Sequence, residues 1–355
     1  MIYREAGQFR IDYAADQRIF PITQDRVAMV VLLVVAFGVV PVIASNYVLT
    51  ALLVPMLVLA LAALGLNILT GYAGQFSLGT AAFMSVGAFA AYNFQLRVPG
   101  IPLLVTFALA GLVAAGVGLV FGLPSLRIKG FYLAVATLAA QFFVDWLFTK
   151  VGWFSNDSPS GTITAQPMMI AGVPIDTPAR RYLLVLSIVS VLALAAKNLS
   201  RTATGRAWMA VRDMDVAAEV IGIPILRTKL VAFGISSFYC GVAGALWAFA
   251  YLGTVEPQAF DLQRSFQILF MVIIGGLGTV MGAFLGAAFI LLFPLFLNWF
   301  LHLVVRGDLR PGLLSQLELV CFGALIIVFL VVEPHGLARL WQITKEKLRL
   351  WPFPH

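Results

Sequence analysis

Residues 197–229, KNLSRTATGRAWMAVRDMDVAAEVIGIPILRTK, are the longest charged interruption in this chain, and they separate two strongly apolar halves. In both halves apolar runs recur with lengths near the ~20 residues that cross a bilayer as a helix. Outside this stretch the chain therefore consists mainly of expected membrane segments and the connections between them.

The composition of the whole chain indicates a membrane protein. Of its 355 residues 61% are hydrophobic and only 11% are charged, whereas soluble domains carry roughly 25% charged residues. Because lipid leaves no partner for open backbone polar groups, helices are the expected spanning elements. We therefore expect an all-α membrane protein, a polytopic helical bundle that forms one integrated domain.

The two ends of the chain and its cysteines fit this class. Residues 1–26 are mixed polar, with no small-residue cleavage site after the first apolar core, so they are not expected to be a cleaved signal peptide. Cys240 and Cys321 both fall inside predicted spans. Buried packing is a better expectation for these thiols than a disulfide.

Ten apolar segments follow one another along the sequence, and we expect each to be a transmembrane helix or part of one. The sixth is short but can extend into its flanks, and the eighth ends at a glycine cluster, as a half-helix inside the protein would. The ten segments are 27–44, 48–70, 78–95, 101–123, 131–150, 182–196, 230–252, 266–274, 280–300 and 314–332.

The distribution of basic residues predicts the orientation of these spans. With ten spans, sixteen of the 23 Lys and Arg residues fall on one side, which the positive-inside rule makes cytoplasmic. Both termini then lie in the cytoplasm. The expected parts are a cytoplasmic arm (1–26), a transmembrane domain (27–332) with an external loop (151–181) and a cytoplasmic central segment (197–229), and a cytoplasmic tail (333–355).

The motif GYAGQFSLG at 71–79 lies between the second and third spans. Its glycines and polar side chains break a helix where the membrane begins, and irregular backbone at that depth is tolerated where it is buried or lines a wet path. A tight helical hairpin without substrate contact is the equally weighted alternative. The expected pathway residues here are Gly71, Gly74, Gln75 and Ser77, with Asn67 one turn earlier.

A second glycine cluster, GGLGTVMG at 275–282, occupies a similar position between the eighth and ninth spans. Gly278, Gly282 and Gly286 are spaced by four, which would put them on one side of a helix and allow close helix packing. Packing is the stronger expectation, and a pathway role for Gly275, Gly276 and Gly278 is the weaker one. Two such clusters in opposite halves also suggest an internal duplication.

Few polar side chains lie within the predicted spans. Asp145 and Glu318 are suspects because intramembrane carboxylates are often functional, but both can reach the outer interface, where Asp145 can pair with Lys150. Gln141 and Asn67 lie deeper. Either amide can hydrogen-bond a substrate or simply a neighbouring helix.

No signature of an enzyme is present in the sequence. No His, Cys and carboxylate cluster matches a metal site, and no catalytic constellation is visible, so we expect neither catalytic residues nor a metal. A GxxxxGK[ST] phosphate loop is also missing, so ATP hydrolysis would require a partner. Lipid is the expected surrounding, and a nucleic-acid partner is not expected.

The central stretch has helical periodicity from Ala207 onward. Arg212, Asp215 and Glu219 occupy one face, Thr204 is a candidate N-cap, Asp213 can cap a second short helix, and Gly222 is a candidate C-terminal stop. A helix lying on lipid headgroups and a helix docking into a partner are both open. The opposite, small and apolar face comprises Ala210, Val211, Met214, Ala217, Ala218 and Ile221.

Four motifs together carry a resemblance to a known family. DVAAEVIG at 215–222 looks like the coupling motif of ABC importer permeases. With GYAGQFSLG, LRIKGFYLAVATLA (126–139) and IGGLGTVMGAFLGA (274–287), it is similar to the branched-chain amino acid permease family, in particular to the longer of its two permease subunits. One departure is Ala283, where many members have proline.

The resemblance implies a function, a set of partners and roles for residues. It implies an ABC importer permease fold in a bacterial inner membrane, a second homologous permease subunit, two ATP-binding subunits that hold ATP and Mg, and a periplasmic substrate-binding protein. No cofactor is expected on this chain itself. The coupling role carried by the motif falls on Ala217, Ala218, Glu219 and Gly222, and the pathway role falls on the glycine-motif residues named above. Asp215 and Arg212 are further candidates for the coupling role.

The expected function is therefore one half of the translocation pathway of an ATP-driven importer for branched-chain or related amino acids. A urea or short-amide ABC importer permease shares the same motifs and stays an alternative. An ion-coupled secondary transporter is a different class, and the feature that it would need, a deep carboxylate, is missing.

Overall fold

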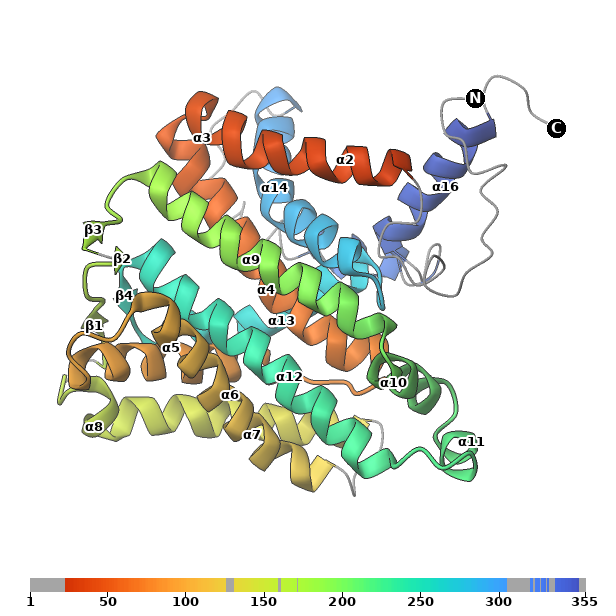
Figure 1. Cartoon of the computed structure of the whole chain (residues 1–355), viewed down its shortest axis with the longest axis horizontal. Helices are drawn as coiled ribbons and strands as arrows, with labels where there is room; N and C mark the ends of the chain where they lie inside the picture. Colours follow the sequence, from red (N-terminus) through yellow and green to blue (C-terminus); the bar gives the residue numbers. More distant parts are fainter. Residues whose placement is uncertain are drawn as a thin grey trace.

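The computed structural model describes residues 23–125, 131–158, 161–170, 172–304, 320–321, 323–325, 327–329, 331 and 336–350. Most of the N-terminal arm, the basic positions Arg127 and Lys129, most of the tenth segment with Glu318, and residues 351–355 lie outside these ranges. The described part is mostly helical, and its few short strands gather at one end of the bundle, opposite α10 and α11 (Figure 1).

The helices follow the apolar segments closely. In chain order they are α2 (Thr23–Val34), α3 (Val40–Ile43), α4 (Val54–Asn67), α5 (Thr80–Arg97), α6 (Leu103–Ser125), α7 (Phe131–Lys150), α8 (Gly152–Ser155), α9 (Pro178–Arg201), α10 (Ala203–Asp213), α11 (Asp215–Val220), α12 (Ile225–Leu246), α13 (Leu262–Gly275), α14 (Val280–Val304) and α16 (Gly336–Leu350). Four π-helical stretches, η1 (Val35–Val39), η2 (Val48–Leu53), η3 (Ile68–Tyr72) and η4 (Trp247–Leu252), continue them, and η5 (Pro257–Phe260) is a 3₁₀ turn.

Seven helical stretches in the described part are long and apolar enough to cross a membrane. The sixth apolar segment does extend into its flanks, because α9 has 24 residues. The eighth became α13, with 14 residues, which reach about 21 Å at 1.5 Å per residue and cannot alone cross a core of about 30 Å. A total of ten spans stays a prediction. The seven stretches are 25–43, 48–72, 103–123, 132–150, 178–201, 225–252 and 280–297.

The centre of the bundle is made of α4, α5, α6 and α12, which pack through small residues. A Cβ atom added to Gly87 of α5 would collide with the backbone of Gly241 in α12, and one added to Gly244 would collide with the backbone of Met84. Close backbone approach of this kind is how helices associate where lipid removes the hydrophobic driving force. The glycines of α5 and α12 therefore set the distance between these two helices.

A second close contact forms the hairpin of α13 and α14. Gly275 lies against the backbone of Gly282, and Gly286 lies against the backbone of Met271. The expected packing role of Gly282 and Gly286 is confirmed. The expectation that Gly278 shares their helix face is wrong, because α14 begins only at Val280 and Gly278 adopts a φ of 74° in the preceding loop.

The loop expected outside the membrane has little regular structure of its own. Strand β1 (Ile163–Thr164) pairs antiparallel with β4 (Thr254–Val255), and β2 (Met169–Ile170) pairs with β3 (Val173–Pro174). The first pair fastens the loop to the segment between α12 and α13. Both cysteines are free thiols, and Cys240 is buried, in agreement with the expected packing role.

Helices from the two ends of the chain meet beside the end of α9. Lys345 Nζ of α16 lies 2.7 Å from Asp25 Oδ1 of α2, and both charges act on Lys197 of α9. Helix α9 leads directly into α10. The first described helix, α2, and the last, α16, therefore meet at the same end of the bundle as the central polar stretch (Figure 1).

The glycine contact between α5 and α12 gives a first prediction. Gly87→Leu should prevent close packing of α5 on Gly241 and lower the free energy of unfolding by about 3 kcal/mol or more, because overpacking against backbone has no flexible neighbour to yield. Thermal unfolding of the protein purified in detergent measures this loss. Gly116→Leu is the matched control, since nothing lies within 4 Å of a Cβ at Gly116. Equal melting temperatures for the two variants would contradict the prediction.

Candidate functional site

The first glycine motif forms an irregular loop between α4 and α5, as expected. After the π-helical turn η3 the chain leaves the helix at Ala73, and Gly74 adopts a φ of 68° that favours glycine. The loop folds back on the end of its own helix, because Gln75 N donates to Leu69 O at 3.0 Å and Thr70 Oγ1 donates to Gln75 O at 3.1 Å. The break in the helix is therefore held in place by local hydrogen bonds.

Asn67 joins this loop region to the second glycine cluster. Its Nδ2 donates to Thr279 O at 2.7 Å, and its Oδ1 accepts from Gly278 N at 2.8 Å. The side chain is fully buried. The sequence allowed this amide to bind either a substrate or a neighbouring helix, and the structure shows it bound to a neighbouring segment. The two hydrogen bonds of Asn67 thus join two motifs that are some 200 residues apart in the sequence.

The same junction leaves no room for side chains at its glycines. A Cβ at Gly71 would strike Asn67 Oδ1 and Gly278 N, and Gly276 has a φ of 115°. Thr279 caps α14, because its Oγ1 accepts from Gly282 N at 3.1 Å. We call this set, Asn67, Gly71, Gly276, Gly278 and Thr279, the glycine junction.

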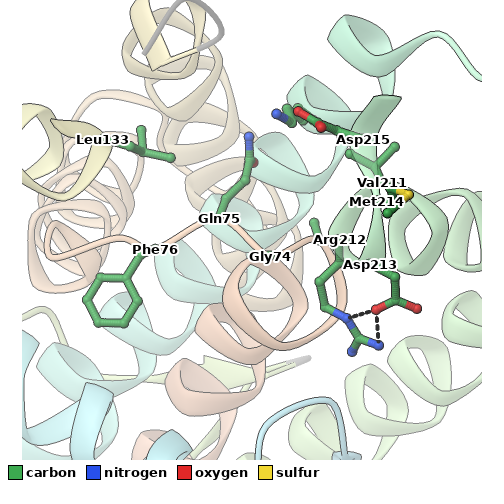
Figure 2. A pocket seen from close by; sticks show the side chains of 11 residues that line it. Gly74, Gln75, Phe76, Leu133, Val211, Arg212, Asp213, Met214 and Asp215 are labelled. Atoms are coloured by element: carbon green, nitrogen blue, oxygen red, sulfur yellow. Dashed lines mark hydrogen bonds and ion pairs between the residues drawn. The ribbon is translucent and has the colours of Figure 1, made fainter. Parts of the chain in front are cut away.

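Arg212 connects the central polar stretch to the glycine junction. Its Nη1 donates to Gly71 O at 2.8 Å, and its aliphatic stem packs against Gly74. The guanidinium also forms an ion pair with Asp213 at 2.9 Å (Figure 2). Arg212 thus uses one of its donors inside the bundle, on the loop that follows α4.

A pocket of about 370 Å³ lies between the central stretch and the first glycine loop. Gln75 extends into the space between Leu133 of α7 and Asp215, whereas Phe76 turns the other way (Figure 2). Gln75 is only 4% exposed, and its Oε1 has no hydrogen-bond partner. The pocket is lined by Ala73, Gly74, Gln75, Phe76, Leu133, Val211, Arg212, Asp213, Met214, Asp215 and Lys229.

After the break, side chains from other helices accept hydrogen bonds from the free backbone N–H groups at the start of α5. Thr137 Oγ1 accepts from Leu78 N at 2.9 Å, Ser265 Oγ accepts from Ala81 N at 2.9 Å, and Gln141 Oε1 accepts from Ala82 N at 2.7 Å. Gln141 also donates to Phe260 O. Gln141 is therefore bound to neighbouring elements, and Thr137 and Ser265 are supporting residues that the sequence did not reveal. Ser77, also in the motif, accepts locally from Gly79 N.

The central stretch consists of two short helices, α10 and α11, which meet at Met214. The N-cap of α10 is Thr202, whose Oγ1 accepts from Gly205 N, and not Thr204. Asp213 does not cap α11 either, because Met214 occupies that position without a side-chain bond. Gly222 does end the helix, with a φ of 87° and the two reversed backbone bonds of a Schellman motif, Ile223 N to Ala218 O and Gly222 N to Glu219 O.

The bend at Met214 also divides the apolar face that the periodicity suggested. Val211 is buried and Ala218 is 2% exposed, whereas Met214, Ala217 and Ile221 are exposed. The apolar positions are therefore divided between two helices, and only some of them are buried. Ala218 faces the bundle, and Ala217, Glu219 and Gly222 face away from it.

The remaining candidate residues stand apart from this site. Asp145 is exposed on α7 and makes no ion pair with Lys150 in the described structure. Glu318 lies outside the described residues. Gly275 belongs to the α13–α14 contact.

The fold and the glycine junction define an all-α, multi-pass membrane protein in which two irregular loops meet inside a helical bundle. Comparison of sequences then gives the family. The family of the branched-chain amino acid transport system / permease component matches residues 48–330, and this chain belongs to that family.

Individual relatives are transport permeases with several substrates in their names. The chain is 28% identical over 312 residues to the high-affinity branched-chain amino acid transport system permease protein LivM of Escherichia coli, covering 81% of this chain and 68% of LivM. It is 29% identical to the autoinducer 2 import system permease protein LsrC of Enterobacter sp., covering 54% of each chain. It is 24% identical to the fructose import permease protein FruG of Bifidobacterium longum, covering 70% and 74%. No solved structure gives a significant match.

The buried amide at the glycine junction gives a second prediction. Asn67→Leu removes both hydrogen bonds and leaves Gly278 N and Thr279 O unpaired, which should lower the free energy of unfolding by about 2–4 kcal/mol at ~1–3 kcal/mol per orphaned group, allowing for overlap. Thermal unfolding in detergent measures the change. Asn46→Leu is the control, because Asn46 is exposed. A melting temperature of Asn67→Leu equal to that of the control would show that the amide does not hold the junction together.

Proposed function

We propose that this chain is the membrane-spanning permease subunit of an ATP-driven importer for branched-chain or related amino acids. It forms half of a translocation pathway, and residues 197–229 couple it to a separate ATPase. The observation that carries the proposal is the hydrogen bond from Arg212 to Gly71 O, since it ties an exposed helix pair to the glycine junction inside the bundle.

The surface of α11 has the character of a protein-docking surface. Val220 is 82% exposed and Ile221 is 73% exposed, and Asp215 and Glu219 lie beside them. On lipid headgroups these carboxylates would face the negative surface of the cytoplasmic leaflet, and α11 has only six residues. A partner protein with an apolar groove and basic neighbours suits this surface better than the headgroup layer does. We assign that groove to the ATPase.

A movement of the docked segment has a defined route into the bundle. Trp208 Nε1 donates to Thr228 O at 3.0 Å and fixes α10 on the start of α12. Arg212 donates a hydrogen bond to Gly71 O. Asn67, one turn before Gly71, is hydrogen-bonded to Gly278 N and Thr279 O. Tilting of α10 and α11 would therefore displace both glycine loops together, the kind of rigid-body change that switches access between sides. The pathway roles proposed for Gly71, Gly74, Gln75, Ser77, Gly275, Gly276 and Gly278 follow from this route.

The cargo and the partners are proposed from the family. Relatives named for branched-chain amino acids, together with a core poor in charge, favour a zwitterionic amino acid that is passed on rather than held. The proposed assembly is a second homologous permease, two ATP-binding subunits carrying ATP and Mg, and a periplasmic substrate-binding protein in a bacterial inner membrane. The proposal includes about ten spans and two cytoplasmic termini.

A permease of a urea or short-amide importer is the second candidate, because it would share the same coupling segment. The ligand of the co-purifying substrate-binding protein decides between the two. An ion-coupled secondary transporter would take up its substrate with an ion gradient and without an ATPase. Co-purification of two ATP-binding subunits with this chain would exclude that class.

Reversing the charge on α11 gives a third prediction. Glu219→Lys should leave insertion in the membrane intact but lower substrate-stimulated ATPase activity and uptake of the reconstituted complex at least tenfold, because it places a cation in the docking surface. Asp176→Lys, an exposed position in the external loop, is the matched charge reversal and should be neutral. Normal stimulation and uptake in Glu219→Lys would refute the coupling role of α11.

Removal of the link at Arg212 gives a fourth prediction. Arg212→Leu should retain assembly with the ATPase and basal ATP hydrolysis but lose most uptake, because α11 still docks while Gly71 is released. Parallel assays of ATP hydrolysis and uptake in proteoliposomes separate these two outcomes. Arg206→Leu is the control, since Arg206 is exposed on the same helix and donates only to Arg201 O. Equal uptake by the two variants would contradict the proposed route.

A further inference from the structure

Two hydrogen-bond donors lie buried and unpaired near the end of the bundle that carries the strands. Trp247 begins the π-helical stretch η4, and Arg264 lies in the first turn of α13. The guanidinium carbon of Arg264 is 4.6 Å from the centre of the Trp247 ring. Trp247 is 3% exposed, and neither its Nε1 nor the Nε of Arg264 has a hydrogen-bond partner.

These two groups share a chemical requirement. Both are donors only, and a buried donor without an acceptor costs about 1–3 kcal/mol, more when it is charged. The nearby carboxylate of Asp261 accepts from the backbone N of Arg264 as the cap of α13, and within the described residues no carboxylate forms a salt bridge with the guanidinium. The site therefore presents a positive charge and two donors without a protein acceptor, which suits an anionic ligand.

The face of α13 beside Arg264 changes character along its length. Gln263 is exposed, and Gln267, which accepts a hydrogen bond from Arg264 Nη1, is partly exposed. Phe266 and Phe270 lie on the same helix face as Gln263 and Gln267 and stack with ring centres 6.2 Å apart, whereas Phe266, two residues after Arg264, lies about 200° around the helix from it. Gln267 is therefore the polar neighbour of Arg264 on this helix. The Trp247 side of the pair belongs to η4, and π-helical segments are frequent at functional sites.

We propose that Arg264 and Trp247 bind the carboxylate of a small amino acid. This site deepens the proposed function and rests on it, because it names the part of the substrate that the permease itself recognises. A guanidinium is suited to a planar carboxylate, which it can bind through two donors.

Ligand binding to the purified importer tests the site. The complex of this chain with its partner subunits, without the substrate-binding protein, is titrated with L-leucine, with 4-methylpentanoate, which lacks the amino group, and with 3-methylbutylamine, which lacks the carboxylate. The two carboxylates should raise the melting temperature, and the amine should not. Arg264→Gln should weaken leucine binding at least tenfold, and Trp247→Phe, which keeps the ring but removes the donor, should weaken it about fivefold to tenfold.

Arg180→Gln is the control, since Arg180 lies outside this site at the start of α9 and donates to Pro174 O. Unchanged leucine binding in both Arg264→Gln and Trp247→Phe, or equal binding of the amine, would overturn the site and leave the proposed function intact. Failure of the wild-type complex to take up any branched-chain amino acid with its binding protein would instead refute the proposed function. If Arg264→Gln does not assemble, Trp247→Phe alone decides.

Discussion

The structure depends on one constraint, which is that backbone groups released by a broken helix inside a membrane need partners within the protein. The chain breaks its helices at 73–79 and again at 276–279. At the first break Thr137, Gln141 and Ser265, from two other helices, accept the free N–H groups. At the second, Asn67 supplies both a donor and an acceptor. Each break is therefore possible only because residues distant in sequence are packed against it, and the small-residue contacts of α5, α12, α13 and α14 bring them there.

The strengths of the links around the glycine junction differ, and the difference has a mechanical consequence. Asn67 is fully buried and makes two hydrogen bonds, so the two glycine loops are joined firmly. Arg212 makes a single bond to Gly71, its side chain is 37% exposed, and a pocket lies beside it. A hydrogen bond in contact with water contributes less than a buried one. The junction is thus expected to move as one unit, with its adjustable point between α10 and the first loop.

Much of this arrangement could be predicted from the sequence, and the limits have physical causes. The apolar runs and the motif at 71–79 predicted the helices and the break, because hydrophobicity and glycine act locally. Gly222 was identifiable for the same reason. The contacts of Asn67 with Gly278 and of Arg212 with Gly71 were not, since they depend on which helices pack together. Thr202, and not Thr204, caps α10, and the bend at Met214 separates the buried Val211 from the exposed Met214 and Ile221. The contact of Arg264 with Trp247 is likewise not predictable, because nothing in the segment around Arg264 indicates which helix packs over it.

Helix α13 links the two sites that the structure suggests. Its C-terminal end leads into the loop at 276–279, which Asn67 holds, and its first turn carries Arg264. A helix of 14 residues is about 21 Å long and behaves as a stiff rod over that distance. If tilting of α10 and α11 displaces the glycine junction, α13 must tilt with it or slide along Gly282 and Gly286. Either movement changes how Arg264 lies over Trp247. A short, half-spanning helix is therefore suited to convert a displacement at the coupling end into a change of carboxylate affinity at the other end, which a full span anchored at both interfaces would resist.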